Sequence, residues 1–79
     1  MAIRNSKDLG AVIRKARLDK NLSQTELARR ASMRQALISD LENGTHSATL
    51  DTLIKILAAL DLDLSIVPRK KADFDPTDY

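Results

Sequence analysis

The chain has 79 residues, of which 43% are hydrophobic, with two glycines and two prolines. This size suits one compact helical domain and leaves no room for a second domain or a large internal cavity. Because cysteine is absent, disulfides and thiolate metal sites are excluded, and association with a second copy is the remaining way to enlarge the core. No apolar run approaches the roughly 20 residues of a membrane span, and no secretory signal begins the chain, which predicts a cytoplasmic protein.

The net charge is +2, but the charges divide along the chain. Residues 1–34 carry nine Lys or Arg against three acids, a balance of +6, whereas residues 35–67 carry one Lys against five acids, a balance of −4. Such an asymmetry is expected when one side of a fold faces phosphates. An ordinary solvated helix surface is the alternative.

The first helix is predicted over residues 6–20. Ser6 can cap its N-terminus, and Asn21 tolerates the left-handed geometry that ends a helix. Its apolar stripe comprises Leu9, Val12, Ile13 and Ala16.

The start of the second helix is strongly marked. Ser23 and Glu26 have the spacing of a capping box, and Leu22 and Leu27 have the spacing of a hydrophobic staple. The helix is expected to end near Ala31, so that the next two residues form a tight turn.

The third helix, over residues 33–44, has two unlike faces. The residues at helical spacing that are expected to face the core are Leu37, Ile38 and Leu41. The residues that point the opposite way are short and polar or carry a methyl group: Gln35, Ala36, Ser39 and Asn43. Gly44 supplies the left-handed residue that closes the helix. Two short helices joined by a tight turn form the arrangement in which the second helix reads base edges in DNA.

A fourth helix follows, with Thr49 as its cap and Leu60 near its end. Leucine, isoleucine and alanine cover it nearly all round, which is typical of a helix buried on more than one side. We therefore expect this helix at the centre of the fold or at a dimer interface.

Residues 62–67 alternate with a period of two and stop at Pro68, which predicts a strand. The chain offers no second strand to pair with it. Pairing with the same strand of a second copy would satisfy its backbone, so the predicted dimerisation residues are Leu62, Leu64 and Ile66, in an intersubunit two-stranded sheet.

Residues 68–79 have neither helical nor strand periodicity and predict a disordered tail, beside a DNA-binding and dimerisation domain at residues 1–67. The three basic and three acidic residues of the tail cancel, so it adds little attraction to phosphate. Phe74 and Tyr79 are the only aromatic residues of the chain, which suggests anchors for a groove on a partner protein. An inert solubilising tail is the alternative.

Three motifs follow one another in the sequence: Leu22-Ser23-Gln24-Thr25-Glu26-Leu27-Ala28; then Ile38-Ser39, Glu42 and Gly44; then Leu50-Asp51-Thr52-Leu53-Ile54-Lys55-Ile56-Leu57. Their order and spacing resemble the lambda-repressor-like (Cro/C1, or xenobiotic-response-element) helix-turn-helix family, over residues 9–60. Within it the chain looks most like HipB-type antitoxins, which add a C-terminal strand and a flexible tail and pair with a HipA-type kinase toxin. The resemblance implies an all-α fold of four helices with a short C-terminal β-strand.

The sequence departs from the family at two turns. Ser32 stands where the family usually has a glycine before the third helix, and Ala48 stands where it usually has a proline before the fourth.

The resemblance assigns base reading to the third helix. Gln35 stands where the family places a base-reading Gln, whose amide can bond adenine N6 and N7. Further base-reading residues are expected at Arg34, Ala36 and Ser39. For each of them, plain exposed helix surface is the alternative.

The resemblance also implies supporting roles. The residues expected to contact phosphate are Ser23, Gln24 and Asn43. Arg17 and Glu42 match a structural ion pair of the family that ties the first helix to the third.

Asp40 opposes this interpretation, because an acid near the groove repels phosphate unless it accepts from cytosine N4 or pairs with an Arg. We expect a structural pairing for it.

Catalysis needs convergent titratable groups, and the one histidine, His46, lies in a loop, so we expect no enzyme activity and no cofactor. The acids of the tail lack the Gly and the closing Glu of an EF-hand, so no metal site is expected.

The sequence thus predicts a homodimeric repressor that binds a palindromic operator in double-stranded DNA and is nucleoid-associated when bound. By resemblance it is an antitoxin that represses its own operon and binds a kinase toxin. Two alternatives stay open. One is a free-standing phage or plasmid repressor without a toxin, and the other is a protein-interaction module that has lost DNA binding.

Overall fold

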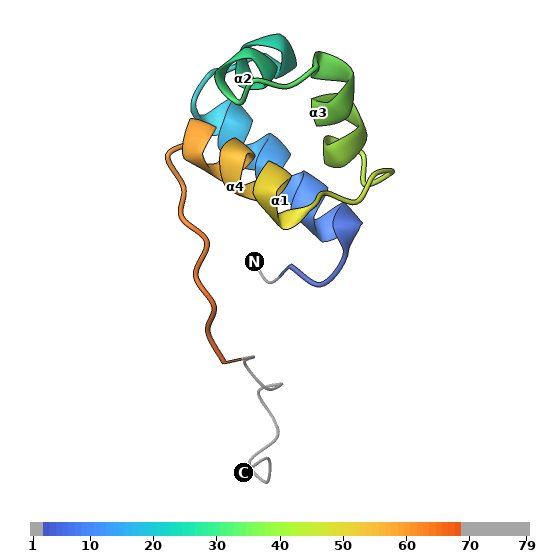
Figure 1. Ribbon diagram of the computed structural model, residues 1–79, viewed down its shortest axis with the longest axis vertical. Helices are drawn as coiled ribbons and strands as arrows, with labels where there is room; N and C mark the ends of the chain where they lie inside the picture. Colours follow the sequence, from blue (N-terminus) through green and yellow to red (C-terminus); the bar gives the residue numbers. More distant parts are fainter. Residues whose placement is uncertain (1–2, 69–79) are drawn as a thin grey trace, which may run out of the picture.

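The computed structural model describes residues 3–68, which form four α-helices. In chain order they are α1 (Ser6–Asp19), α2 (Gln24–Arg30), α3 (Gln35–Glu42) and α4 (Leu50–Ala59). Helix α3 packs against both α1 and α2, and α2 also packs against α4 (Figure 1). The predicted four-helix fold is therefore confirmed. No helix within residues 3–68 is long and apolar enough to cross a lipid bilayer.

The core draws side chains from all four helical segments. The fully buried large side chains are Ile13, Leu27, Ile38, Leu41, Ile56 and Leu60. At Gly10 the backbones of α1 and α3 come so close that an added Cβ would clash with the Leu41 carbonyl oxygen and lie 2.6 Å from that of Glu42. The absence of a side chain at Gly10 thus sets how closely α1 approaches the end of α3.

Side-chain caps fix the starts of α2 and α4 as expected. The Ser23 hydroxyl accepts from the Glu26 N–H at 3.0 Å, and the Thr49 hydroxyl accepts from the Thr52 N–H at 3.2 Å. Asn21 has the predicted left-handed φ of 58°. The capping box itself is incomplete: among the described residues, the Glu26 carboxylate makes no return bond to the Ser23 N–H, and it lies 3.9 Å from an Arg29 nitrogen.

The cap of α1 differs from the prediction. Asn5, not Ser6, precedes the helix in extended geometry, and its side-chain oxygen accepts from the Asp8 N–H at 2.8 Å. Both residue types are good caps, so their adjacency in the sequence left the choice open.

Helix α3 begins two residues later than the predicted start at Met33. Ser32 adopts a left-handed φ of 59°, and the Met33 N–H donates to the Ala28 carbonyl at 2.8 Å. This bond completes the C-terminal cap of α2, so Met33 belongs to the turn. Helix α3 then starts at Gln35 and ends at Glu42, after which Gly44 has the predicted positive φ, at 76°.

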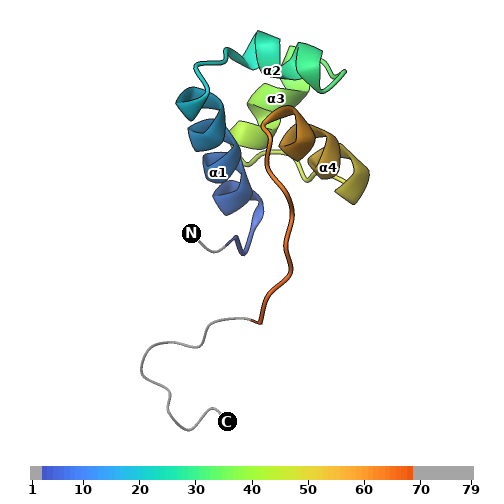
Figure 2. The ribbon, with the colours of Figure 1, turned by 90° about the vertical axis from the view of Figure 1, so that its left-hand side faces the viewer.

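Helix α4 does not lie at the centre of a single chain. One face is buried through Ile56 and Leu57, but Leu50 is 60% exposed and Ile54 is 48% exposed. Below it, the segment 62–68 runs away from the four helices (Figure 2). Within the described part of the chain this segment forms no strand. A strand that pairs only with a second copy has no partner within one chain, so the intersubunit sheet stays a prediction.

The predicted tail, apart from Pro68, lies outside the described residues, and Phe74 and Tyr79 lie there with it.

Candidate nucleic-acid interface

Helices α2 and α3 form a helix-turn-helix whose second helix has one open face. Ile38, Leu41 and Glu42 bury the inner face of α3 against α1 and α2. Within residues 3–68 no other helix covers its outer face (Figure 1). The open face carries most of the residues that the sequence analysis selected for base reading.

A buried ion pair anchors this unit to α1. Arg17 and Glu42 are each only 8% exposed. The Arg17 guanidinium donates to Glu42 from Nε at 2.7 Å and from Nη2 at 3.0 Å, and its Nη1 donates to the Leu22 carbonyl at 2.7 Å. The hydrogen bond to Glu42 raises the pKa of Arg17, against the opposing effect of burial. The guanidinium therefore ties α1 both to the end of α3 and to the segment before α2.

Two glutamines extend this ion pair to the surface. Gln24 Nε2 donates to Glu42 Oε1 at 3.2 Å, and Gln35 Nε2 donates to Gln24 Oε1 at 2.7 Å. We call the set Arg17, Glu42, Gln24 and Gln35 the polar relay. It runs from a buried arginine to an exposed amide at the first position of α3. The hydrogen bond to Gln24 thus fixes the orientation of the Gln35 side-chain amide.

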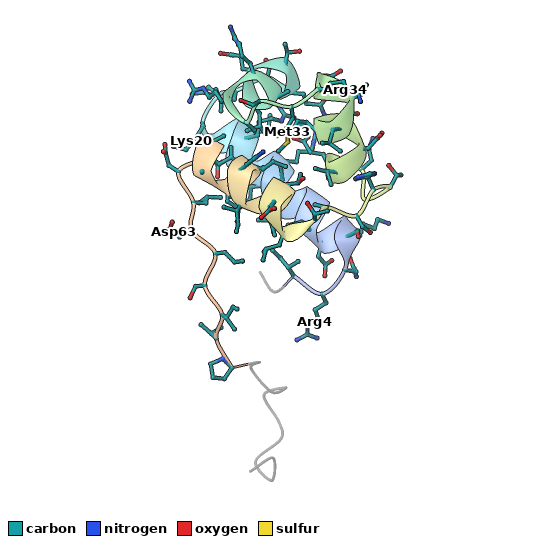
Figure 3. The ribbon with its side chains drawn as sticks, viewed as in Figure 1. Arg4, Lys20, Met33, Arg34 and Asp63 are labelled. Carbon is teal, nitrogen blue, oxygen red and sulfur yellow. The ribbon has the colours of Figure 1, made fainter. Side chains whose placement is uncertain are left out.

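The other residues selected for base reading lie around Gln35. Arg34 is exposed and immediately precedes α3, and Figure 3 shows it at the tip of that helix. Ala36 is exposed, whereas Ser39 is half-buried. Of these residues, Ser39 is the least available to a DNA base.

The residues selected for phosphate contact divide into two kinds. The Ser23 hydroxyl caps α2, and Gln24 belongs to the polar relay, so both already have partners within the protein. Asn43 is exposed just after α3. Arg17 also has all its described partners inside the protein, which makes it architectural.

Sequence reasoning missed two basic residues beside Asn43. Lys7 and Arg14 of α1 and Asn43 are among the residues that line a shallow surface hollow of about 560 Å³; Lys15, which pairs with Asp19, lines it as well. Gly44 lets Lys7 come close to the end of α3, because a Cβ at Gly44 would lie 2.9 Å from the Lys7 Cα. The sequence signal was Gly44, which was interpreted as a helix cap and not as a residue that contacts α1.

A second hollow, of about 630 Å³, flanks α3 on its other side. Among the residues that line it are Arg34, Ala36, Asp40 and His46. The expected structural pairing of Asp40 is wrong for the described part of the chain: its carboxylate is exposed and forms no ion pair there. Its carbonyl oxygen, not its carboxylate, accepts from the N–H and the hydroxyl of Thr45.

A helix-turn-helix whose second helix leaves one face uncovered is a class of nucleic-acid-binding fold, and here the buried Arg17–Glu42 pair holds it against α1. Residues 13–67 match the helix-turn-helix family HTH_3. The chain belongs to this lambda-repressor-like family, and it is similar to HipB-type antitoxins.

Two relatives and one solved structure illustrate the similarity. The ImmF control region 10 kDa protein of Bacillus phage phi105 is 38% identical over 63 residues, 80% of this chain and 70% of that protein. Antitoxin HipB of Escherichia coli K12 is 38% identical over 56 residues, 71% of this chain and 64% of HipB. A structure described as a HipA-HipB-O2-O3 complex contains a chain that superposes with a TM-score of 0.78 at 31% identity, over 89% of this chain and 99% of that one.

Proposed function

We propose that the protein is a sequence-specific transcriptional repressor that inserts α3 into the major groove of operator DNA. The observation that carries the proposal is the polar relay, which holds the exposed Gln35 amide by a 2.7 Å bond at the start of α3. An amide held in this way can bond adenine N6 and N7 without first being ordered. Arg34 and Ala36 then read neighbouring bases, with Ser39 at the edge of the contact.

Phosphate contacts position the helix along the groove. Asn43 follows the end of α3, and Ser23 and Gln24 stand at the start of α2. Lys7 and Arg14 add positive charge beside Asn43. Contacts of this kind fix register and carry no sequence information.

The repressor acts as a homodimer on a palindromic operator, with half-sites about 34 Å apart. Support comes from exposed apolar side chains: Leu50 and Ile54 of α4, Leu62 at 38%, Leu64 at 51% and Ile66 at 92%. So much exposed apolar surface marks an interface. The predicted pairing of residues 62–67 with their two-fold copy covers this surface and closes the intersubunit sheet.

The partner proposed beyond DNA is a kinase toxin, bound as an antitoxin whose operon the dimer represses. Similarity to HipB and to a chain of the HipA-HipB-O2-O3 complex supports this assignment. The tail at residues 68–79 serves as the handle, with Phe74 and Tyr79 as anchors. The protein works in the cytoplasm, at the nucleoid when bound to its operator. The relative from the ImmF control region of Bacillus phage phi105 favours the second candidate, a free-standing phage repressor without a toxin.

The test of the DNA-binding proposal compares two glutamine variants on a selected operator and on random DNA. Gln35→Ala should weaken operator binding by about 1–3 kcal/mol and leave binding to random DNA nearly unchanged. Gln24→Ala serves as the matched variant, since it removes both a phosphate contact and the support of Gln35. If Gln35→Ala weakens both DNAs equally, Gln35 does not read sequence.

The test of the dimer is a chain that ends at Asp61. Without residues 62–67 the two-fold sheet cannot form, so sedimentation should show monomers or an unfolded chain. An intact dimer would contradict the assignment.

The toxin proposal is tested by titration calorimetry with a HipA-type kinase, comparing the full chain with one that ends at Pro68. Undiminished affinity of the shorter chain would remove the tail from the contact.

A further inference from the structure

The outward face of α3 is centred on two of the residues that the sequence pattern selected, Ala36 and Asn43, and on Asp40, which it did not select. Successive residues of an α-helix are about 100° apart around the axis. Ala36, Asp40 and Asn43 therefore lie within about 60° of one another, directly opposite the buried side of the helix. All three are exposed. Gln35 and Ser39 lie roughly 70–110° to one side of this centre, toward α2 and the polar relay.

Asp40 thus lies within about 30° of the centre of this outward face, which the proposed DNA binding turns toward the groove. Its carboxylate has no hydrogen-bond or ion-pair partner within residues 3–68, although Arg34 and His46 line the same hollow. A free carboxylate at this place repels the phosphates that line the groove. The repulsion is offset only if the carboxylate finds a hydrogen-bond donor on the DNA.

The base edges decide which donor that is. In the major groove guanine presents two acceptors and thymine presents an acceptor and a methyl group, so both repel a carboxylate. Adenine presents a donor beside the N7 acceptor, whereas cytosine presents its N4 amino group as a donor without an acceptor of its own beside it. Cytosine is the base that suits an unpaired, acceptor-only side chain.

We infer that Asp40 is a specificity-determining residue, which accepts a hydrogen bond from the N4 amino group of one cytosine in each half-site. The inference rests on the proposed DNA-binding function and adds to it a base identity. Asp40 then acts in two ways: it selects cytosine at one position, and it lowers affinity for DNA that lacks cytosine there.

The experiment first selects an operator from random DNA duplexes with the full chain. The selected half-site should hold one position at which cytosine is required and at which each other base weakens binding about 5- to 100-fold. The same selection and titrations are repeated with Asp40→Asn, whose amide both donates and accepts. The cytosine penalty should vanish at that one position, adenine should become acceptable there, and binding to random DNA should strengthen.

Asp19→Asn is the matched control. It removes the same charge from an exposed aspartate at the end of α1, whose only ion pair among the described residues is the exposed one with Lys15 at 3.2 Å. Its base preferences should equal those of the parent protein. Because Asp40 is exposed, both variants should unfold at the temperature of the parent, which thermal unfolding followed by circular dichroism checks.

Two results overturn the inference in distinguishable ways. If the parent selects an operator but Asp40→Asn keeps every base preference, Asp40 does not read a base while the repressor function stands. If the parent enriches no sequence at all, the proposed function fails and the role of Asp40 fails with it.

Discussion

Replacing Arg17 by Met tests how much of the fold depends on the buried end of the polar relay. The change removes three hydrogen bonds, two to Glu42 and one to the Leu22 carbonyl. Among the described residues it leaves the Glu42 carboxylate, whose side chain is 2% exposed, with only the 3.2 Å bond from Gln24. Loss of one partner of a buried ion pair costs about 3–5 kcal/mol.

This cost is large for so small a domain. At about 0.05–0.15 kcal/mol per residue, the 79 residues supply a total stability of about 4–12 kcal/mol. The Arg17→Met variant should therefore lose from about a quarter to all of its stability, measured as the free energy of unfolding in urea by circular dichroism.

The double variant Arg17→Met, Glu42→Met separates architecture from DNA reading. With no uncompensated charge left in the interior, it should regain most of the lost stability. It should still bind operator more weakly than the parent, because Gln24 has lost the acceptor that positions it. If the free energy of unfolding of Arg17→Met alone lies within about 1 kcal/mol of the parent value, the reasoning is refuted, since the Arg17–Glu42 pair would then not be buried as described.

Three further predictions concern the core and the surface. Leu41→Ala should lower the free energy of unfolding by about 2–5 kcal/mol through a core cavity, and an unchanged thermal midpoint would contradict this. Gly10→Ala should cost about 1–3 kcal/mol in the same assay, because its Cβ would force α1 away from the Leu41 and Glu42 carbonyls. The Lys20 ammonium, 2.9 Å from the Asp61 carboxylate, lowers the pKa of Asp61 below 3.8. Any stabilisation from this pair is full above pH 3.8 and is lost as the pH falls through the lowered pKa. Lys20→Met should therefore raise the Asp61 midpoint in an NMR titration toward its ordinary value.

Local patterns predicted the four helices well, because capping and apolar spacing act over a few residues. Ser23 and Thr49 cap as expected, and the inward face of α3 contains Ile38 and Leu41. The expected turn at residues 32 and 33 is confirmed, whereas the start of α3 at Met33 was wrong, because a left-handed Ser32 continues the C-terminal cap of α2. A serine rarely adopts that geometry, so only the family's glycine at this position pointed to it.

Long-range contacts were less accessible to sequence reasoning. The Arg17–Glu42 pair was named only through family resemblance, since no spacing rule joins residues 25 apart. The role of Gly10 was not foreseen, because a single glycine within a helix does not reveal what approaches it. The absence of a partner for Asp40 within the described chain depends on the positions of Arg34 and His46, which only the fold supplies.

Glu42 fixes the donor-to-acceptor direction of every hydrogen bond in the polar relay. An ionised carboxylate can only accept, so Glu42 obliges Gln24 to present its NH₂ group inward and its carbonyl oxygen outward. That oxygen in turn obliges Gln35 to spend one N–H on Gln24, which leaves the Gln35 carbonyl oxygen and one N–H for a base. In the proposed complex with DNA, the buried Glu42 therefore sets which groups of the Gln35 amide are left for a base, and a reversed Gln24 amide would exchange them.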